Sequence, residues 1–160
     1  MKRIQPFRTI LLLVLAFAAG ANGQESEHGG HDAAHSYHEH VVAGFVGMAF
    51  EGSRDEGLAL GVEYERRLNE RWGIGALVEH TFGDLDVWGF GVPLAYHSGP
   101  WKFYTAPGIE DGEHGSEFLL RLGVEYGFHR GIWEISPQVD IDFVDGEEIY
   151  VIGVTVGRGL

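Results

Sequence analysis

Large apolar residues alternate with small or polar residues along most of this chain. In residues 117–128, Phe118 begins a run with an apolar side chain at every second position, while Glu, Arg and Gly occupy the positions between. A period of two is typical of a β-strand whose two faces meet different surroundings. The pattern resumes in residues 132–143 after a short turn, so the two segments predict a β-hairpin.

Similar alternation extends from Val41 to the end of the chain, with no helical period and no second domain boundary. We therefore predict one all-β domain over residues 41–160, built as an antiparallel up-and-down meander. Pro93, Pro107 and Pro137 lack a backbone N–H, so bulges or strand ends are expected there. The eight predicted strands are 41–50, 57–67, 71–82, 86–97, 101–109, 117–128, 132–143 and 148–158.

The predicted connections alternate in length and in charge. Short turns at Asn69-Glu70, Ser98-Gly99-Pro100 and His129-Arg130 alternate with longer acidic loops. A meander places all short turns at one end of the sheet and all long loops at the other. Basic residues gather near the short turns and acidic residues near the loops. The acidic loops are expected around 51–56, 83–86, 110–116 and 144–147.

The volume of a closed eight-stranded barrel decides which face is inside. Its interior is just wide enough for side chains to fill, and the apolar face would send Trp72, Trp88, Trp101 and Trp133 into it. The opposite face carries many of the 25 glycines together with scattered polar residues. We therefore expect the apolar face outside, against lipid. The alternative is a soluble lipocalin-like ligand-binding barrel with an apolar lumen.

Aromatic residues cluster near both ends of the predicted strands, as expected where rings sit at two membrane interfaces. Strands of about ten residues match a tilted membrane crossing. On this pattern the chain after residue 40 resembles the small eight-stranded bacterial outer-membrane β-barrels. The resemblance implies short turns and both termini in the periplasm and long loops outside. It also implies a monomer whose partners are outer-membrane lipid, lipopolysaccharide and the barrel assembly machinery.

The N-terminal sequence is typical of an export signal. Lys2, Arg3 and Arg8 precede an apolar run that is too short for a transmembrane helix, and Ala21-Asn22-Gly23 supplies small residues for cleavage before Gln24. Residues 1–23 are thus predicted to be a signal peptide. The chain carries a formal charge of −13, which disfavours nucleic acid as a partner. It has no cysteine, so disulfides and thiolate metal sites are excluded.

Residues 24–40 contain no large aliphatic residue and are expected to form a flexible periplasmic tail rich in histidine. Closely spaced imidazoles in such a tail can wrap zinc, copper or nickel without a preformed site. A solubilising tail is the alternative, because no fixed zinc-motif spacing is present. The candidate metal ligands are His28, His31, His35, His38 and His40.

The inward face predicts a polar network in the lumen, with Arg121 as its single basic residue. Buried charges are tolerated when they are paired or hydrated, so we expect Arg121 to bridge to Glu125 or to a neighbour. The network either plugs the barrel or, because acidic linings favour cations, forms a narrow cation-preferring pathway. Its predicted members are Arg121, Glu63, Glu79, Glu125, Glu134, Gln138 and Asp140.

No nucleophile motif of the G-x-S-x-G kind occurs, and His97-Ser98 are neighbours whose side chains point to opposite faces of a strand. We therefore predict a non-enzymatic outer-membrane protein with a structural or interaction role in the envelope and no bound cofactor apart from the tail metal. The alternatives are a narrow cation-preferring pore or transport-accessory protein, and the soluble ligand-binding barrel.

Overall fold

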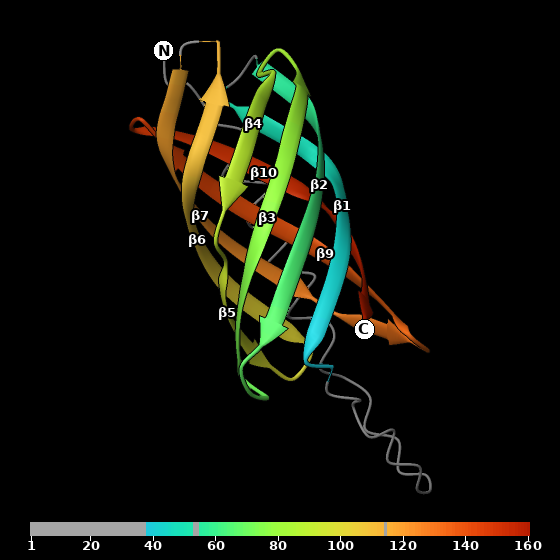
Figure 1. Ribbon diagram of the computed structural model, residues 1–160. Coiled ribbons are helices and arrows are strands. Elements are labelled where there is room, and N and C mark those ends of the chain that lie inside the picture. The colour runs from blue at the N-terminus through green and yellow to red at the C-terminus, as the bar shows by residue number, and fades with distance from the viewer. Residues whose placement is uncertain (1–37, 53–54, 114) are drawn as a thin grey trace, which may run out of the picture. The chain divides into compact units, whose positions relative to one another are not determined.

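The computed structural model describes residues 38–52, 55–113 and 115–160, and every regular element among them is a β-strand (Figure 1). The predicted signal peptide and most of the histidine-rich tail lie outside the described residues. No helix within the described ranges is long and apolar enough to cross a membrane. The strands are β1 (His40–Glu51), β2 (Asp55–Arg67), β3 (Trp72–Gly83), β4 (Val87–Gly91), β5 (Leu94–Ser98), β6 (Trp101–Gly112), β7 (Gly115–Tyr126), β8 (Phe128–Arg130), β9 (Trp133–Val144) and β10 (Glu147–Gly159).

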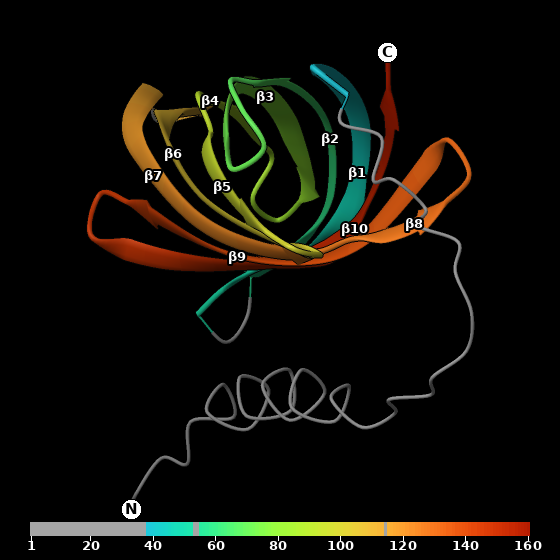
Figure 2. The ribbon, with the colours of Figure 1, turned by 90° about the horizontal axis from the view of Figure 1, so that it is seen from below.

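The ten strand segments form a closed barrel of eight antiparallel strands (Figure 2). Two of the barrel strands consist of two segments each, because β4 and β5 together form the fourth barrel strand and β8 continues β7 beyond Gly127. Each barrel strand pairs with its neighbours in the sequence, and β10 pairs with both β9 and β1 to close the ring. The predicted all-β fold with eight antiparallel strands is therefore confirmed.

The fourth barrel strand is interrupted at Val92 and Pro93, between β4 and β5. Val92 donates its N–H to the carbonyl oxygen of Pro107 on β6 at 2.9 Å, and Pro107 has no N–H to donate in return. The prediction of a strand end at Pro93 is thus confirmed. The same prediction is wrong for Pro107 and Pro137, which lie inside β6 and β9 and keep their register with Leu120 and Val154.

The predicted division into short turns and long loops is wrong, because the connections are short at both ends. Asp145 and Gly146 alone join β9 to β10, with φ angles of 46° and 86° that suit a tight two-residue hairpin. We call the end with connections 68–71, 99–100 and 131–132 the basic end. The end with connections 52–54, 84–86, 113–114 and 145–146 is the acidic end.

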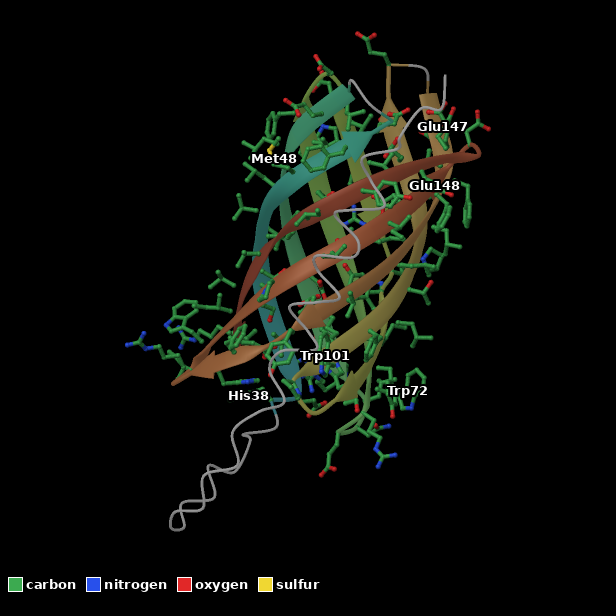
Figure 3. All side chains as sticks on the ribbon, turned by 180° about the vertical axis from the view of Figure 1, so that it is seen from behind. His38, Met48, Trp72, Trp101, Glu147 and Glu148 are labelled. Atoms are coloured by element: carbon green, nitrogen blue, oxygen red, sulfur yellow. The ribbon has the colours of Figure 1, made fainter. Side chains whose placement is uncertain are left out.

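The outward face is apolar along the whole barrel. Figure 3 shows Trp72 and Trp101 toward one end and Glu147 and Glu148 toward the other. Rings pair at both ends, as Trp101 and Tyr126 do at 4.8 Å between centroids near the basic end. The exposed large side chains include Val46, Leu58, Leu60, Val62, Trp72, Phe82, Trp88, Phe90, Phe103, Ile109, Phe118, Leu122, Phe128, Trp133 and Ile135. This arrangement is the one expected for a lipid-facing surface and not for a soluble barrel.

Glycines make room for the ring of Phe45, which lies in the buried core. Gly47 and Gly153 are register partners on β1 and β10, and both point inward beneath this ring. A Cβ atom added to Gly153 would lie 2.4 Å from the ring and 2.4 Å from the carbonyl oxygen of Val46. Glycine is therefore required here by close approach and by the limited width of the lumen.

We expect Gly153→Ala to lower the free energy of unfolding by about 1–3 kcal/mol, because the added methyl group meets both a ring and a backbone oxygen. Urea unfolding of the barrel in micelles, followed by tryptophan fluorescence, measures the change. Gly44→Ala is the matched control, since a Cβ there meets no atom within 4 Å. Equal stability of both variants would show that the crowding at Gly153 is relieved without cost.

Candidate functional site

The alternation of the strands sends a connected set of polar side chains into the lumen. Most of these residues have almost no exposed surface, so each charge needs a partner inside the barrel. They form three layers between the acidic and the basic end. The buried polar residues are Glu65, Glu79, Thr81, His97, Arg121, Glu125, Ser136, Gln138, Asp140, Asp142 and Thr155.

The layer nearest the acidic end is built around Arg121 on β7. Its Nε and Nη2 donate to the two oxygens of Asp142 on β9, each at 2.7 Å. Its Nη1 and Nη2 also donate across the lumen to Glu79 on β3, at 3.1 and 2.7 Å. A guanidinium held in two forks by two carboxylates is the strongest ion-pair geometry that arginine makes. Arg121 therefore ties opposite walls of the barrel together.

The middle layer is a hydrogen-bond chain between three strands. The Tyr104 hydroxyl donates to Oδ1 of Asp140 at 2.6 Å, and Gln138 Nε2 donates to the Tyr104 oxygen at 2.8 Å. The Thr155 hydroxyl completes this series of hydrogen bonds by donating to the side-chain amide oxygen Oε1 of Gln138. Gly123 permits this packing, since a Cβ there would lie 2.3 Å from the Tyr104 ring. These hydrogen-bonded side chains fill the middle of the lumen.

The layer nearest the basic end is built around Lys102 on β6. Its Nζ lies 2.5 Å from Glu63 Oε1, 2.9 Å from Glu125 Oε1 and 3.5 Å from Glu65 Oε2. The ammonium is thus shared by three carboxylates from two other strands. This sharing compensates for the cost of removing four charged groups from bulk water.

Glu65 extends this layer to two further basic groups. Its Oε1 lies 2.7 Å from His97 Nε2 and 2.9 Å from Arg67 Nε. Glu134, on the neighbouring wall, accepts from Ser136 at 3.3 Å and lies 3.0 Å from His129. Near the basic end the carboxylates therefore meet several basic side chains.

The structure corrects three expectations about the lumen. Arg121 is not its only basic residue, because Lys102 also points inward and is largely buried. Arg121 binds Glu79 and Asp142, whereas Glu125 pairs with Lys102. Glu117 shares the inward parity of Arg121 on this strand and is therefore also expected inside, but it is exposed near the acidic end, where the strand projects beyond the packed lumen.

Lys102, His97 and Tyr104 are among the lumen residues that the sequence did not predict, as are Thr155, Ser136 and Thr81. The signal was present in the alternation, since Lys102 and Tyr104 fall between the outward residues Trp101, Phe103 and Thr105. Lys102 also lies beside a short turn, and a long basic side chain near a strand end can reach back into the lumen.

The free space left in the lumen is small. Cavities of about 30, 20 and 10 Å³ lie along it. A cavity needs about 10–15 Å³ of such volume to hold one water molecule, so each of these spaces holds about one or two waters at most. The largest cavity lies near the basic end and is lined by Glu63, Glu65, Lys102, Glu125 and Glu134, among others.

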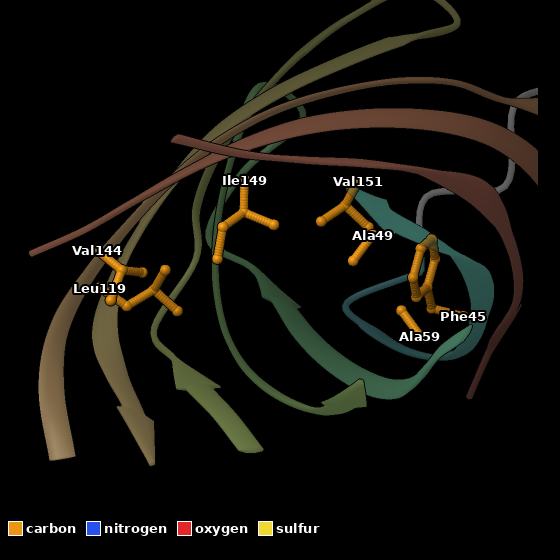
Figure 4. Close-up of a cluster of buried hydrophobic side chains, with 7 residues drawn as sticks. All are labelled: Phe45, Ala49, Ala59, Leu119, Val144, Ile149 and Val151. Atoms are coloured by element: carbon orange, nitrogen blue, oxygen red, sulfur yellow. The ribbon is translucent and has the colours of Figure 1, made fainter. Parts of the chain in front are cut away.

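Apolar side chains also pack together inside the barrel, in a cluster that extends from Val144 and Ile149 near the acidic end to Phe45 (Figure 4). Leu119 and Val151 are 1% exposed, and Leu85 from the 84–86 connection packs against them. The full cluster is Phe45, Ala49, Ala59, Leu119, Val144, Ile149 and Val151. The barrel is thus closed by an apolar layer above its polar layers.

Of the five candidate metal ligands, His28, His31 and His35 lie outside the described residues. His40 Nδ1 lies 2.7 Å from the Tyr64 hydroxyl. His38 packs against Gly159, where an added Cβ would lie 2.1 Å from the imidazole ring. In the part of the chain that the structure describes, no three His, Asp or Glu residues are grouped as metal ligands.

Comparison with protein families finds no matching family, and comparison with curated proteins finds no relative. Solved structures do match. The crystal structure of Ail, the attachment invasion locus protein of Yersinia pestis, has a TM-score of 0.55 and 11% identity over 76% of this chain and 97% of Ail. Ail in a phospholipid bilayer nanodisc gives a TM-score of 0.53, 10% identity and coverage of 78% and 100%. A de novo designed transmembrane β-barrel has a TM-score of 0.52 and 11% identity over 73% of this chain and 94% of the designed chain.

These similarities are at the level of fold, since identity is low throughout. This chain has the fold of the small eight-stranded outer-membrane β-barrels.

We expect Arg121→Ala to lower the free energy of unfolding by about 3–5 kcal/mol, because it leaves Glu79 and Asp142 buried without their cation. Arg71→Ala is the matched control. Arg71 is an exposed arginine with no carboxylate partner within 4.0 Å among the described residues, and its loss should change stability by less than 0.5 kcal/mol or so. Urea unfolding in micelles measures both. An Arg121→Ala barrel as stable as the control would rule out this pairing as a structural support.

Proposed function

We propose that this protein is an exported, non-enzymatic outer-membrane barrel with a closed lumen and a structural or interaction role in the envelope. One observation carries the proposal. The outward face is apolar, while the lumen is filled by the Arg121 and Lys102 ion-pair layers and by the apolar cluster beside them. A barrel built this way is stable in lipid and leaves little room for a substrate.

The charge difference between the two ends supports an orientation for the barrel. The basic end, from which the tail departs, faces the periplasm in this proposal, and the acidic end faces outward. The described residues of the acidic end carry carboxylates and no exposed Lys or Arg. The described residues of this end would therefore contact lipopolysaccharide phosphates through bridging divalent cations. The barrel assembly machinery would receive the chain on the periplasmic side.

A narrow cation-preferring pore is the competing function. Its support is the excess of carboxylates over basic residues in the lumen, which favours cations. Against it stand the small cavities and the apolar cluster near the acidic end. Conduction would require Leu119, Ile149 and their neighbours to move apart.

Metal capture by the histidine-rich tail is a second function, and the position of His38 favours it. Gly159 lies on the inward face of β10, so the His38 ring that packs on it sits at the mouth of the lumen. The largest cavity opens near this mouth and is rich in carboxylates. A cation that His38 helps to hold would therefore lie near these carboxylates, which raises its local concentration.

We expect the full chain to fractionate with the outer membrane and to migrate differently on gels before and after heating. Planar-bilayer recordings of the purified barrel should show no steady current, because the lumen is closed. Recovery as a soluble periplasmic monomer would rule out the membrane assignment. A steady cation-selective current would favour the pore instead.

For the tail, isothermal titration of the full mature chain with zinc should lose most of its binding heat in the His28→Asn/His31→Asn/His35→Asn variant. The control variant, His80→Asn/His129→Asn, removes histidines of the barrel and should bind zinc as the parent does. Equal heats in the tail variant and the parent would eliminate metal capture by these three residues.

A further inference from the structure

Two exposed arginines flank an exposed tryptophan on the outward face at the basic end. Arg130 on β8 is the register partner of Trp133 on β9, and Trp133 is the register partner of Arg158 on β10. All three side chains lie on the outward face, and Trp133 is 48% exposed. Neighbouring strands are about 4.8 Å apart, so the two arginine backbones are about 10 Å apart with the indole between them.

Neither arginine of this row is neutralised by the barrel itself. Over the described ranges, no carboxylate lies within 4.0 Å of the guanidinium of Arg130 or Arg158. Arg66, at the same end, differs because Glu39 lies 3.2 Å from it. The row therefore presents two uncompensated positive charges beside a ring that favours the membrane interface.

The next outward row toward the middle of the barrel is apolar and contains a gap. Phe128, Ile135 and Val156 are register partners in sequence across β8, β9 and β10, and each is exposed. Gly44 on β1 continues this row as the partner of Val156. A Cβ at Gly44 would meet no atom within 4 Å, so the surface is notched between Val156 and Val62.

We propose that this surface binds one anionic phospholipid of the leaflet at the basic end. The guanidinium groups of Arg130 and Arg158 bind the headgroup phosphate, for which arginine has a matching donor geometry. Trp133 lies at the level of the glycerol backbone. An acyl chain runs along Ile135 and Val156 into the notch at Gly44.

The chemistry of the site selects a lipid over a soluble anion. Phosphate alone would use the two arginines but not the apolar row beneath them, which the acyl chain of the same lipid covers. The same outward row at the acidic end offers no basic residue among those described there. The inference rests on the proposed membrane location, since a barrel outside a bilayer would not meet this ligand.

Tryptophan quenching by brominated lipid tests the site in the full mature chain. Trp72, Trp88 and Trp101 are replaced by Phe, which leaves Trp133 as the single indole, and the barrel is reconstituted in phosphatidylcholine vesicles with a minor fraction of brominated phosphatidylglycerol. Quenching of Trp133 should exceed that from the same fraction of brominated phosphatidylcholine. Each arginine should enrich the anionic lipid roughly fivefold at low salt.

Arg130→Gln/Arg158→Gln in this background should reduce quenching by the two brominated lipids to the same level. Arg66→Gln/Arg71→Gln removes the same charge from the same end but outside the row, and the preference should persist. A chain that retains only Trp88, near the acidic end, should show no preference. Glycerol phosphate added to the buffer should not abolish the preference, whereas its abolition would point to a simple phosphate site and overturn the lipid assignment.

Two results separate this inference from the proposed function. If the parent chain inserts and shows heat-modifiable migration but Trp133 is quenched equally by both lipids, the lipid site is wrong and the membrane barrel stands. If the parent chain does not insert into any vesicle, both are wrong. Unchanged preference in Arg130→Gln/Arg158→Gln would also overturn the site.

Discussion

The narrow lumen of an eight-stranded barrel is the constraint on which the rest of this structure depends. Large aromatic side chains do not fit inside, so they lie on the outer surface and commit that surface to lipid. The inward positions that remain are filled by small residues and by charges, which must then pair with one another because bulk water is excluded. The result is two sets of ion pairs, one between Arg121 and both Glu79 and Asp142, the other between Lys102 and three glutamates. The apolar exterior and the polar interior are thus two consequences of one geometric limit.

The fold could be predicted from the sequence because the alternation of side chains is a local property. The alternation within each strand distinguishes an apolar face from a polar or glycine-rich face. The volume of the barrel then decides which of the two is inside. The length of the loops could not be predicted in the same way. Strands such as β9 and β10 continue past the apolar pattern to the Asp145-Gly146 turn, and backbone pairing keeps their polar ends in the sheet. Polar residues at a strand end look like a loop in the sequence.

The ion pairs of the lumen could be predicted only in part, for a different physical reason. Arg121 and Asp142 are direct register partners, so their meeting follows once the strands are aligned. Arg121 and Glu79 belong to strands that face each other across the lumen, and their contact depends on the closure and tilt of the whole barrel. Neither strand register nor barrel closure bears on the tail histidines His28, His31 and His35, so their role is a question for metal titration.

Closure of the barrel by β1 and β10 has a consequence for how the chain folds. Val42 and Arg158 are register partners, although they stand at opposite ends of the domain sequence. The backbone N–H of Leu160 also donates to the carbonyl oxygen of His40 at 2.9 Å. The last residues of the chain must therefore be present before the first strand is paired on both sides. Contacts of such long sequence separation are associated with slow folding, and until they form, two strand edges remain exposed to pairing with other chains. A barrel that closes in this way must be kept from aggregating until its first and last strands have paired.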